Sequence, residues 1–128
     1  MKRSECDSFL QGYLDAALFT TDPNPPQGVD YAESDRADKM YQKIPNWFIE
    51  NARKDCAKFA VENHRLLGYA GDAWQNGADF WFTRNRHGVG FWDRGYSDDV
   101  GDPLSDAAHS FGESYLDETD LGFKPNEN

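Results

Sequence analysis

Cysteine is scarce in this chain, with Cys6 and Cys56 the two in its 128 residues. Two cysteines are too few for the disulfide framework of a small secreted domain. Both fall at core-facing positions of predicted helices, so we expect buried, reduced thiols of the kind found in cytosolic proteins. No run of about 18 apolar residues is present, and the sequence turns polar directly after Met1. We therefore expect neither a membrane span nor a signal peptide.

Basic residues are also few, with 13 lysines and arginines against 23 acidic residues and a net charge of −10. Residues 95–128 hold nine of the acidic side chains and one of the basic ones. Direct nucleic-acid binding is disfavoured, because phosphate contacts need a basic patch. An acidic surface can meet a basic partner or imitate nucleic-acid charge toward a DNA-binding protein, although it can also serve solubility alone. The candidate acidic surface comprises Asp98, Asp99, Asp102, Asp106, Glu113, Asp117, Glu118 and Asp120.

Sequence motifs of catalysis are missing as well. The chain has no Cys-x-x-Cys pair, no His-x-x-x-His pair, no phosphate-binding glycine loop and no Gly-x-Ser-x-Gly turn. His87 has no orienting carboxylate beside it in the sequence, and Asp106 with His109 would give a metal two ligands, which do not make a site. We therefore predict no catalytic residue, metal site or cofactor, and an enzyme is the least favoured class of protein.

Aromatic residues are plentiful, at 15% of the chain. Such a content is too high for a disordered chain, and the length suits one compact domain. We expect a single globular domain over residues 1–123 and a polar tail over residues 124–128. Its core should gather Phe9, Leu14, Phe48, Phe59, Phe111 and at least one of Trp81 and Trp92.

Apolar residues at helical spacing predict three amphipathic helices, over residues 4–18, 46–67 and 103–116. The proline-rich segment 21–28 ends the first helix, and Ser34 is a candidate cap for a short additional helix over 35–42. Pro45 lies near the start of the second helix, and the glycines between Gly68 and Gly77 are expected to end it. Asp102 and Pro103 form an N-cap and first-turn pair for the third.

Residues 80–85 and 89–94 are rich in strand-favouring aromatic and β-branched types. Between them, Arg86, His87 and Gly88 suit a three-residue hairpin loop in which Gly88 takes the left-handed position. A short strand at 121–123 could pair with this hairpin. The sequence thus predicts an α+β fold with helices on one face of a small antiparallel sheet.

The predicted hairpin concentrates planar donors beside aromatic rings. Such a group suits a stacked nucleotide or phosphate, a protein-binding hot spot, or a structural network in which Arg84 or Arg94 bridges to Asp79 or Asp93. We favour the structural network, then the protein contact, then the nucleotide. The candidate binding residues are Trp81, Arg84, Asn85, Arg86, His87, Trp92, Asp93 and Arg94.

These residues also carry a family resemblance. The pattern DFW-x-TRN-x-HG-x-GFWDRG over residues 79–95 resembles a family of small uncharacterised proteins of tailed bacteriophages. Arg86 departs from that pattern, which has a small residue such as glycine there. The resemblance implies a phage accessory protein in the cytoplasm of the infected bacterial host. Proteins of this kind bind and redirect or inhibit a host protein.

We therefore predict a non-catalytic phage protein that binds and modulates or inhibits a host protein, with defence and nucleic-acid-processing proteins among the candidates. The contact would use the acidic surface, the aromatic and arginine hairpin, or both. Homo-oligomerisation stays open. The alternative is a small-ligand module that binds or sequesters a nucleotide at the hairpin, in a concave pocket lined by Arg84, Asn85 and Trp81 or Trp92.

Overall fold

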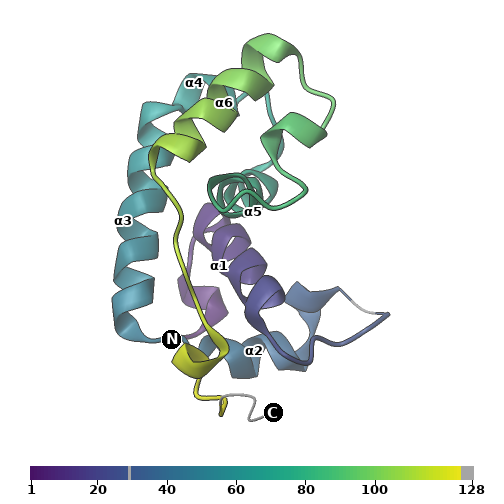
Figure 1. Ribbon diagram of the computed structural model, residues 1–128, viewed down its shortest axis with the longest axis vertical. Coiled ribbons are helices and arrows are strands. Elements are labelled where there is room, and N and C mark those ends of the chain that lie inside the picture. Colours follow the sequence, from purple (N-terminus) through teal and green to yellow (C-terminus); the bar gives the residue numbers. More distant parts are fainter. Residues whose placement is uncertain (29, 125–128) are drawn as a thin grey trace.

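Two helices, α1 (Ser8–Thr21) and α5 (Ala73–Arg84), pack against each other at the centre of the molecule (Figure 1). The structure is a computed structural model that describes residues 1–28 and 30–124. The remaining elements, with η denoting a short 3-10 helix, are η1 (Arg3–Glu5), η2 (Tyr31–Glu33), α2 (Asp35–Tyr41), α3 (Asn46–Glu62), α4 (His64–Leu67), η3 (Phe91–Asp93), α6 (Asp98–Ser110) and η4 (Glu118–Leu121).

None of the described residues forms a β-strand, so the predicted α+β fold is wrong and this part of the chain is all-helical. The predicted strand at residues 121–123 is also wrong, since η4 ends there. The polar tail predicted for residues 124–128 falls, apart from Lys124, outside the described residues. No helix in the described ranges combines the length and the apolar character needed to cross a membrane.

The middle of helix α1 is buried on all sides. The N-cap of the helix is Asp7, whose carboxylate accepts a hydrogen bond from the Leu10 amide at 2.8 Å. Every residue from 12 to 18 is buried, because α5, α3 and α2 cover different faces of the helix. Such burial explains why the segment YLDAAL reads as apolar around most of its circumference.

Two glycines allow α1 and α5 to touch backbone to backbone. A Cβ atom placed on Gly12 would lie 1.9 Å from the carbonyl oxygen of Trp74. A Cβ atom placed on Gly77 would lie 1.9 Å from the carbonyl oxygen of Phe9. The predicted helix does end at the first of the expected glycines, Gly68, whereas Gly77 belongs to the next helix. Gly77 lies inside α5, where the absence of a side chain sets the closeness of the central packing.

The first strand of the predicted hairpin is the second half of α5. Asp72 caps this helix by accepting a hydrogen bond from the Gln75 amide at 2.8 Å. Phe80 and Trp81 are both buried. A helix buried on most of its surface carries large apolar residues in succession, and that composition also fits a strand. Burial, and not β-propensity, accounts for these aromatic residues.

The predicted hairpin turn is the C-terminal cap of α5. Arg86 takes the left-handed conformation, with φ of 56°. The His87 amide donates to the Phe82 carbonyl at 2.9 Å, and the Arg86 amide donates to the Thr83 carbonyl at 3.1 Å. These two bonds make a Schellman motif, which reverses the chain without forming a strand. The left-handed position expected at Gly88 belongs to Arg86.

The second predicted strand folds back over α5 as an irregular segment that contains η3. The Phe91 amide donates to the Thr83 hydroxyl at 3.2 Å, and Phe91 is buried. Gly90 passes so close to Thr83 that a Cβ atom there would lie 2.3 Å from its hydroxyl oxygen. Residues 83 and 91, which would face each other across a three-residue hairpin loop, are therefore in contact, but the contact joins a helix to a loop.

The other helix predictions are largely confirmed, with shifted ends. Ser34 caps α2 by accepting from the Ala37 amide at 3.1 Å. The predicted helix over 46–67 divides into α3 and α4 next to Asn63. Helix α6 starts at Asp98 and ends at Ser110, so Pro103 lies inside it and Asp102 is not its N-cap. Acidic residues in the first turn favour the earlier start, because they complement the helix dipole.

The core forms where α3, α5 and α1 meet. The Phe59 ring stacks on the Phe80 ring with centroids 4.2 Å apart. Of the residues predicted to be in the core, Leu14, Phe48, Phe59 and Trp81 are buried. Phe9 and Phe111 are half-buried against them, whereas Trp92 is exposed. Cys6 and Cys56 are free and buried, as expected.

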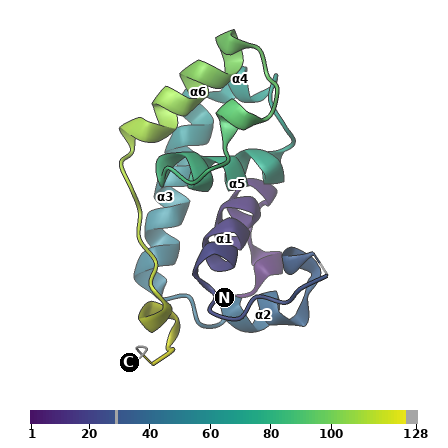
Figure 2. The same ribbon diagram turned by 45° about the vertical axis from the view of Figure 1, so that its right-hand side comes forward.

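Residues 111–117, here called the C-terminal strap, run from α6 along the molecule toward α2 (Figures 1 and 2). The Leu116 carbonyl accepts a hydrogen bond from the Thr21 hydroxyl at 3.1 Å, and the Leu116 side chain is buried. At the far end, Phe123 lies beneath the cations of Arg36 and Lys43. The strap thus joins the two ends of the molecule.

Replacing Arg86 with glycine is expected to raise the free energy of unfolding by about 0.5–1 kcal/mol, because glycine takes the left-handed conformation without a Cβ clash. Urea melts would measure the change. Arg86→Ala is the matched control, since alanine removes the charged side chain and keeps the Cβ atom. An equal gain in both variants would assign the effect to the side chain and not to the backbone.

Candidate functional site

Arg84 is engaged inside the protein. Its guanidinium donates to the carbonyls of Gly112 at 2.9 Å and Phe111 at 3.2 Å, both in the strap. It also donates to the Tyr13 hydroxyl at 3.1 Å and to the Asp55 carboxylate at 2.9 Å. The side chain is 4% exposed. These bonds tie α5 to α1, α3 and the strap, so Arg84 has a structural role.

Arg94 forms the other ion pair of the candidate set. Its Nε and a terminal nitrogen donate to the two carboxylate oxygens of Asp79 at 2.8–3.2 Å. Asp79 is fully buried, and Gln75 donates to it as well at 3.1 Å. Of the bridges predicted from Arg84 or Arg94 to Asp79 or Asp93, the one between Arg94 and Asp79 is present. Arg84 pairs instead with Asp55 of α3, a partner that was not predicted.

Burial raises the pKa of the Asp79 carboxyl above its ordinary value, and the hydrogen bonds and charge of Arg94 oppose that rise without cancelling it. The same hydrogen bonds raise the pKa of the Arg94 guanidinium. The arginine cation thus offsets part of the free-energy cost of burying a charged carboxylate.

Trp81 and Asn85 also hold the structure together. The Trp81 indole is buried and donates to the Thr20 hydroxyl at 3.1 Å. The Asn85 side-chain amide donates to the Trp81 carbonyl at 3.0 Å and accepts from the Ser114 amide at 2.8 Å. Asn85 therefore fastens the strap to the end of α5.

The other candidates of the predicted hairpin lie at the surface. Arg86, His87, Trp92 and Asp93 are all exposed, Trp92 to 55%. The His87 ring packs edge-on against Phe82, with centroids 5.9 Å apart. Arg84 points inward from α5, Arg94 pairs with Asp79 after η3, and Trp92 is exposed. The predicted group of arginine and tryptophan side chains therefore does not converge on one site.

A cleft of about 210 Å³ lies between the end of α1, the end of α5 and the strap. Trp81, Asn85 and His87 line it together with strap residues that include Glu113 and Asp117. Neither Arg84 nor Trp92 is among its lining residues. Small-molecule pockets usually measure about 300–1,000 Å³, so this cleft is small for a nucleotide.

The acidic candidates are spread over α6, the strap and η4. Four of them follow α6, at the end of the molecule away from α2 (Figure 2): Asp98, Asp99, Asp102 and Asp106. Their side chains are exposed, as are those of Glu113, Asp117 and Glu118, whereas Asp120 is half-buried. Within residues 1–28 and 30–124, none of these carboxylates forms an ion pair. We call the four on α6 the acidic stripe.

Two further ion pairs were not predicted from the sequence. Arg3 binds the buried carboxylate of Asp15 with its closest approach at 2.7 Å, and Asp15 also accepts from the Trp74 indole at 2.8 Å. Arg36 binds the buried Asp22 at 2.7 Å. A lone carboxylate inside the apolar run from residue 13 to 19 was the available signal for Asp15, because such a group needs a buried partner.

The Asp22 carboxyl is held in its charged form. Burial alone would raise its pKa, but hydrogen bonds from Arg36, from the Asn24 amide and from Tyr31 outweigh the burial and lower it. Tyr31 donates to Asp22 at 2.9 Å, and burial together with this bond raises the pKa of the tyrosine. The proline-rich loop and η2 are thereby fixed to the end of α1.

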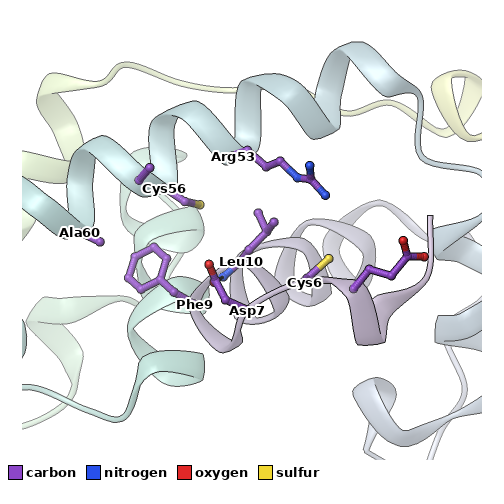
Figure 3. Close-up of a pocket in the computed structure, with 9 residues that line it drawn as sticks. Cys6, Asp7, Phe9, Leu10, Arg53, Cys56 and Ala60 are labelled. Carbon is purple, nitrogen blue, oxygen red and sulfur yellow. Dashed lines mark hydrogen bonds between the residues drawn. The ribbon is translucent and has the colours of Figure 1, made fainter.

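The two cysteines line a groove of about 330 Å³ between α3 and the start of α1 (Figure 3). Cys56 comes from α3 and Cys6 from the segment before α1, with Phe9 and Leu10 also lining the groove. Burial raises the pKa of both thiols. Because the thiolate is the reactive form, neither cysteine is set up as a nucleophile.

Among residues 1–28 and 30–124, no three His, Cys, Asp or Glu side chains gather closely enough to hold a metal ion. No protein-family model, curated protein sequence or solved structure matches the chain.

Proposed function

We propose that this chain is a non-catalytic phage accessory protein that binds and modulates a basic host protein through the acidic stripe of α6. The bacteriophage origin and the cytoplasm of the infected bacterium as its place of action rest on the resemblance of residues 79–95. The class of partner rests on charge. A stripe of carboxylates attracts a positively charged protein surface and speeds the encounter with it.

The observation that carries this proposal is a contrast between two sets of carboxylates. Asp15, Asp22, Asp55 and Asp79 each pair with an arginine. The stripe has no such partner in the described part of the chain, although Asp98, Asp102 and Asp106 follow one another at a spacing of four residues. Like charges at that spacing destabilise a helix by about 0.2–0.5 kcal/mol per pair. Asp98 and Asp99 favour the start of α6 through the helix dipole, but no carboxylate of the stripe forms an ion pair that would stabilise the described fold. The stripe therefore stays available for a cationic partner.

The same contrast bears on nucleic acid and on nucleotides. Arg84 is buried and Arg94 pairs with Asp79, so both guanidinium groups are already engaged within the protein. The rival hypothesis of a nucleotide module needs a pocket lined by Arg84 with a tryptophan, and the cleft beside Trp81 has no arginine in its lining. No observation favours that alternative over protein binding.

The test is affinity capture from bacterial lysate with the whole chain as bait, in three forms. Asp98→Asn, Asp102→Asn and Asp106→Asn together remove charge from the stripe. Glu33→Gln, Asp35→Asn and Asp38→Asn remove the same charge from exposed positions near α2. We expect the native chain and the α2 variant to retain a basic protein that the stripe variant loses.

For the captured protein, the association rate with the stripe variant should be about 10-fold lower at low salt, because steering by a charged surface is lost. Added salt should slow the native chain toward the same rate, since exposed charges are screened beyond about 8–10 Å near physiological ionic strength. Equal losses in the stripe and α2 variants would point to net charge alone. A rate that ignores salt would contradict the proposal.

A further inference from the structure

Another hollow lies where α1, η2 and α5 meet. It measures about 190 Å³, and four of its walls are aromatic: Phe19, Tyr31, Trp74 and Phe82. The floor is made of alanines, whose small side chains create the space: Ala16, Ala32 and Ala78. The remaining lining residues, Asp15 and Asp30, are acidic, and no lysine or arginine is among the nine.

The rings are held in place by the protein itself. The Trp74 indole donates to the buried Asp15, and the Tyr31 hydroxyl donates to the buried Asp22. Phe19 meets the Tyr31 ring edge-on, with centroids 5.9 Å apart. A ligand entering the hollow therefore need not order these walls, which lowers the entropic cost of binding.

Phe19 has no role in the core that explains its position. It is 52% exposed, although it lies on the most deeply buried helix. A large apolar ring at the rim of an aromatic hollow is typical of a recognition surface, where it contributes area that a partner covers.

The charge of the hollow selects a cation. Asp30 is exposed, and one of its oxygens accepts from the Ala32 amide at 3.2 Å, leaving the other for a ligand. The Asp15 carboxylate accepts from Arg3, Tyr41 and Trp74, so it contributes little free charge. Aromatic faces attract cations through their quadrupole, and a carboxylate beside them adds a direct ion pair.

From these features we infer that the hollow binds one arginine side chain of a partner protein, with its guanidinium over the aromatic rings and paired with Asp30. A hollow of about 190 Å³ falls below the usual range for small-molecule sites and suits a single side chain. Arginine fits better than lysine, because its planar group stacks on rings and pairs with a carboxylate through two hydrogen bonds. This inference deepens the proposed function and rests on it for the identity of the partner as a basic protein.

The probe is N-acetyl-arginine amide, which mimics an arginine within a chain, titrated into the whole protein and followed by NMR at the Trp74 indole proton. We expect saturable shifts there, and no such shifts with the neutral isostere N-acetyl-citrulline amide. The lysine analogue should bind at least about 3-fold more weakly, since an ammonium does not stack as a guanidinium does. Free arginine binding 10-fold more tightly than the amide would assign the hollow to a metabolite and overturn the inference.

Two substitutions keep the test specific. Asp30→Asn removes the charge and keeps an acceptor for the Ala32 amide, and Phe19→Ala removes one exposed wall. Each should weaken probe binding by about 3-fold to 10-fold, consistent with the loss of one cation–π or ion-pair contact. Trp47→Ala, at an aromatic residue that is 50% exposed elsewhere, should leave the affinity unchanged. Equal binding of the citrulline probe, or an unchanged affinity in Phe19→Ala and Asp30→Asn, would overturn the inference.

The probe also separates this inference from the proposed function, because it needs neither the host protein nor the acidic stripe. Probe binding without any captured partner would leave the hollow standing and contradict the function of the stripe. A captured partner without probe binding would support the function of the stripe and contradict arginine binding in the hollow. The stripe variant should bind the probe as the native chain does.

Discussion

Replacing Arg94 with methionine is expected to lower the free energy of unfolding by about 3–5 kcal/mol at neutral pH, because it leaves a buried carboxylate without its cation. Asp79 is 0% exposed, and the Gln75 amide at 3.1 Å would remain as a hydrogen-bond donor to it. Methionine keeps most of the aliphatic stem of arginine, so the loss reports the charge more than the packing. Urea melts at several pH values would measure it.

The loss should shrink in acid. The folded-state pKa of Asp79 is already raised, so the carboxyl favours the folded state when it is protonated. That contribution is fully present below the unfolded pKa of about 3.9 and is lost as the pH rises through the higher folded value. Removing Arg94 takes away the charge that opposes the rise, and the folded pKa moves higher still. The variant should therefore approach the native chain in stability as the pH falls toward 4.

A double variant supplies the control. Asp79→Asn combined with Arg94→Met removes both charges, and most of the lost stability should return, because replacing a whole buried pair is often close to neutral. Arg86→Met, at an exposed arginine, should change the stability by less than about 0.5 kcal/mol. A double variant as unstable as Arg94→Met alone would show that the orphaned carboxylate is not the cause.

Gly77→Ala is expected to destabilise the protein by about 3 kcal/mol or more, at the upper end of the range for overpacked interiors. The new Cβ atom would lie 1.9 Å from the Phe9 carbonyl oxygen and 2.8 Å from its carbonyl carbon. Both are backbone atoms of α1, so relief requires the two helices to separate. Helix propensity alone favours alanine over glycine by about 1 kcal/mol, which makes the sign of the measured change decisive.

Gly88→Ala is the matched control for this substitution. A Cβ atom at Gly88 would meet nothing within 4 Å, and its φ is not in the left-handed region. Alanine there should range from no effect to a gain of about 1 kcal/mol, through the lower entropy of the unfolded chain. A stabilised Gly77→Ala variant would mean that α1 and α5 do not touch at this point.

Gly77 also explains why the fold class was predicted wrongly. Because Gly77 was assigned to the segment that ends the preceding helix, the first half of α5 was not predicted. Phe80, Trp81 and Phe82 were then assigned to a strand from their β-propensity. The capping pair of Asp72 and Gln75 pointed the other way. Local sequence does not distinguish a glycine that ends a helix from one that admits a neighbouring helix, because the second case depends on a contact distant in the chain.

The amphipathic helices were predicted well because their pattern is local to the sequence. Residues in α3 and α6 alternate between core and solvent at helical spacing, so their sequence carries the pattern directly. The acidic residues of the stripe could be identified from the sequence, because their charge does not depend on contacts that the fold creates. The ion pairs of Arg3, Arg36 and Arg84 were not predictable, because each partner belongs to a different element and only the packing of the helices brings the two together.

The course of the C-terminal strap affects how the protein can be attached to other molecules. Phe123 lies beside the cations of Arg36 and Lys43, and the Met1 carbonyl accepts from Gln42 at 3.1 Å. Both ends of the described chain therefore reach the α2 region, whereas α6 lies at the other end of the long axis (Figure 1). A surface, dye or carrier joined at either end would stand away from the stripe. Immobilised copies would then present α6 outward in a common orientation.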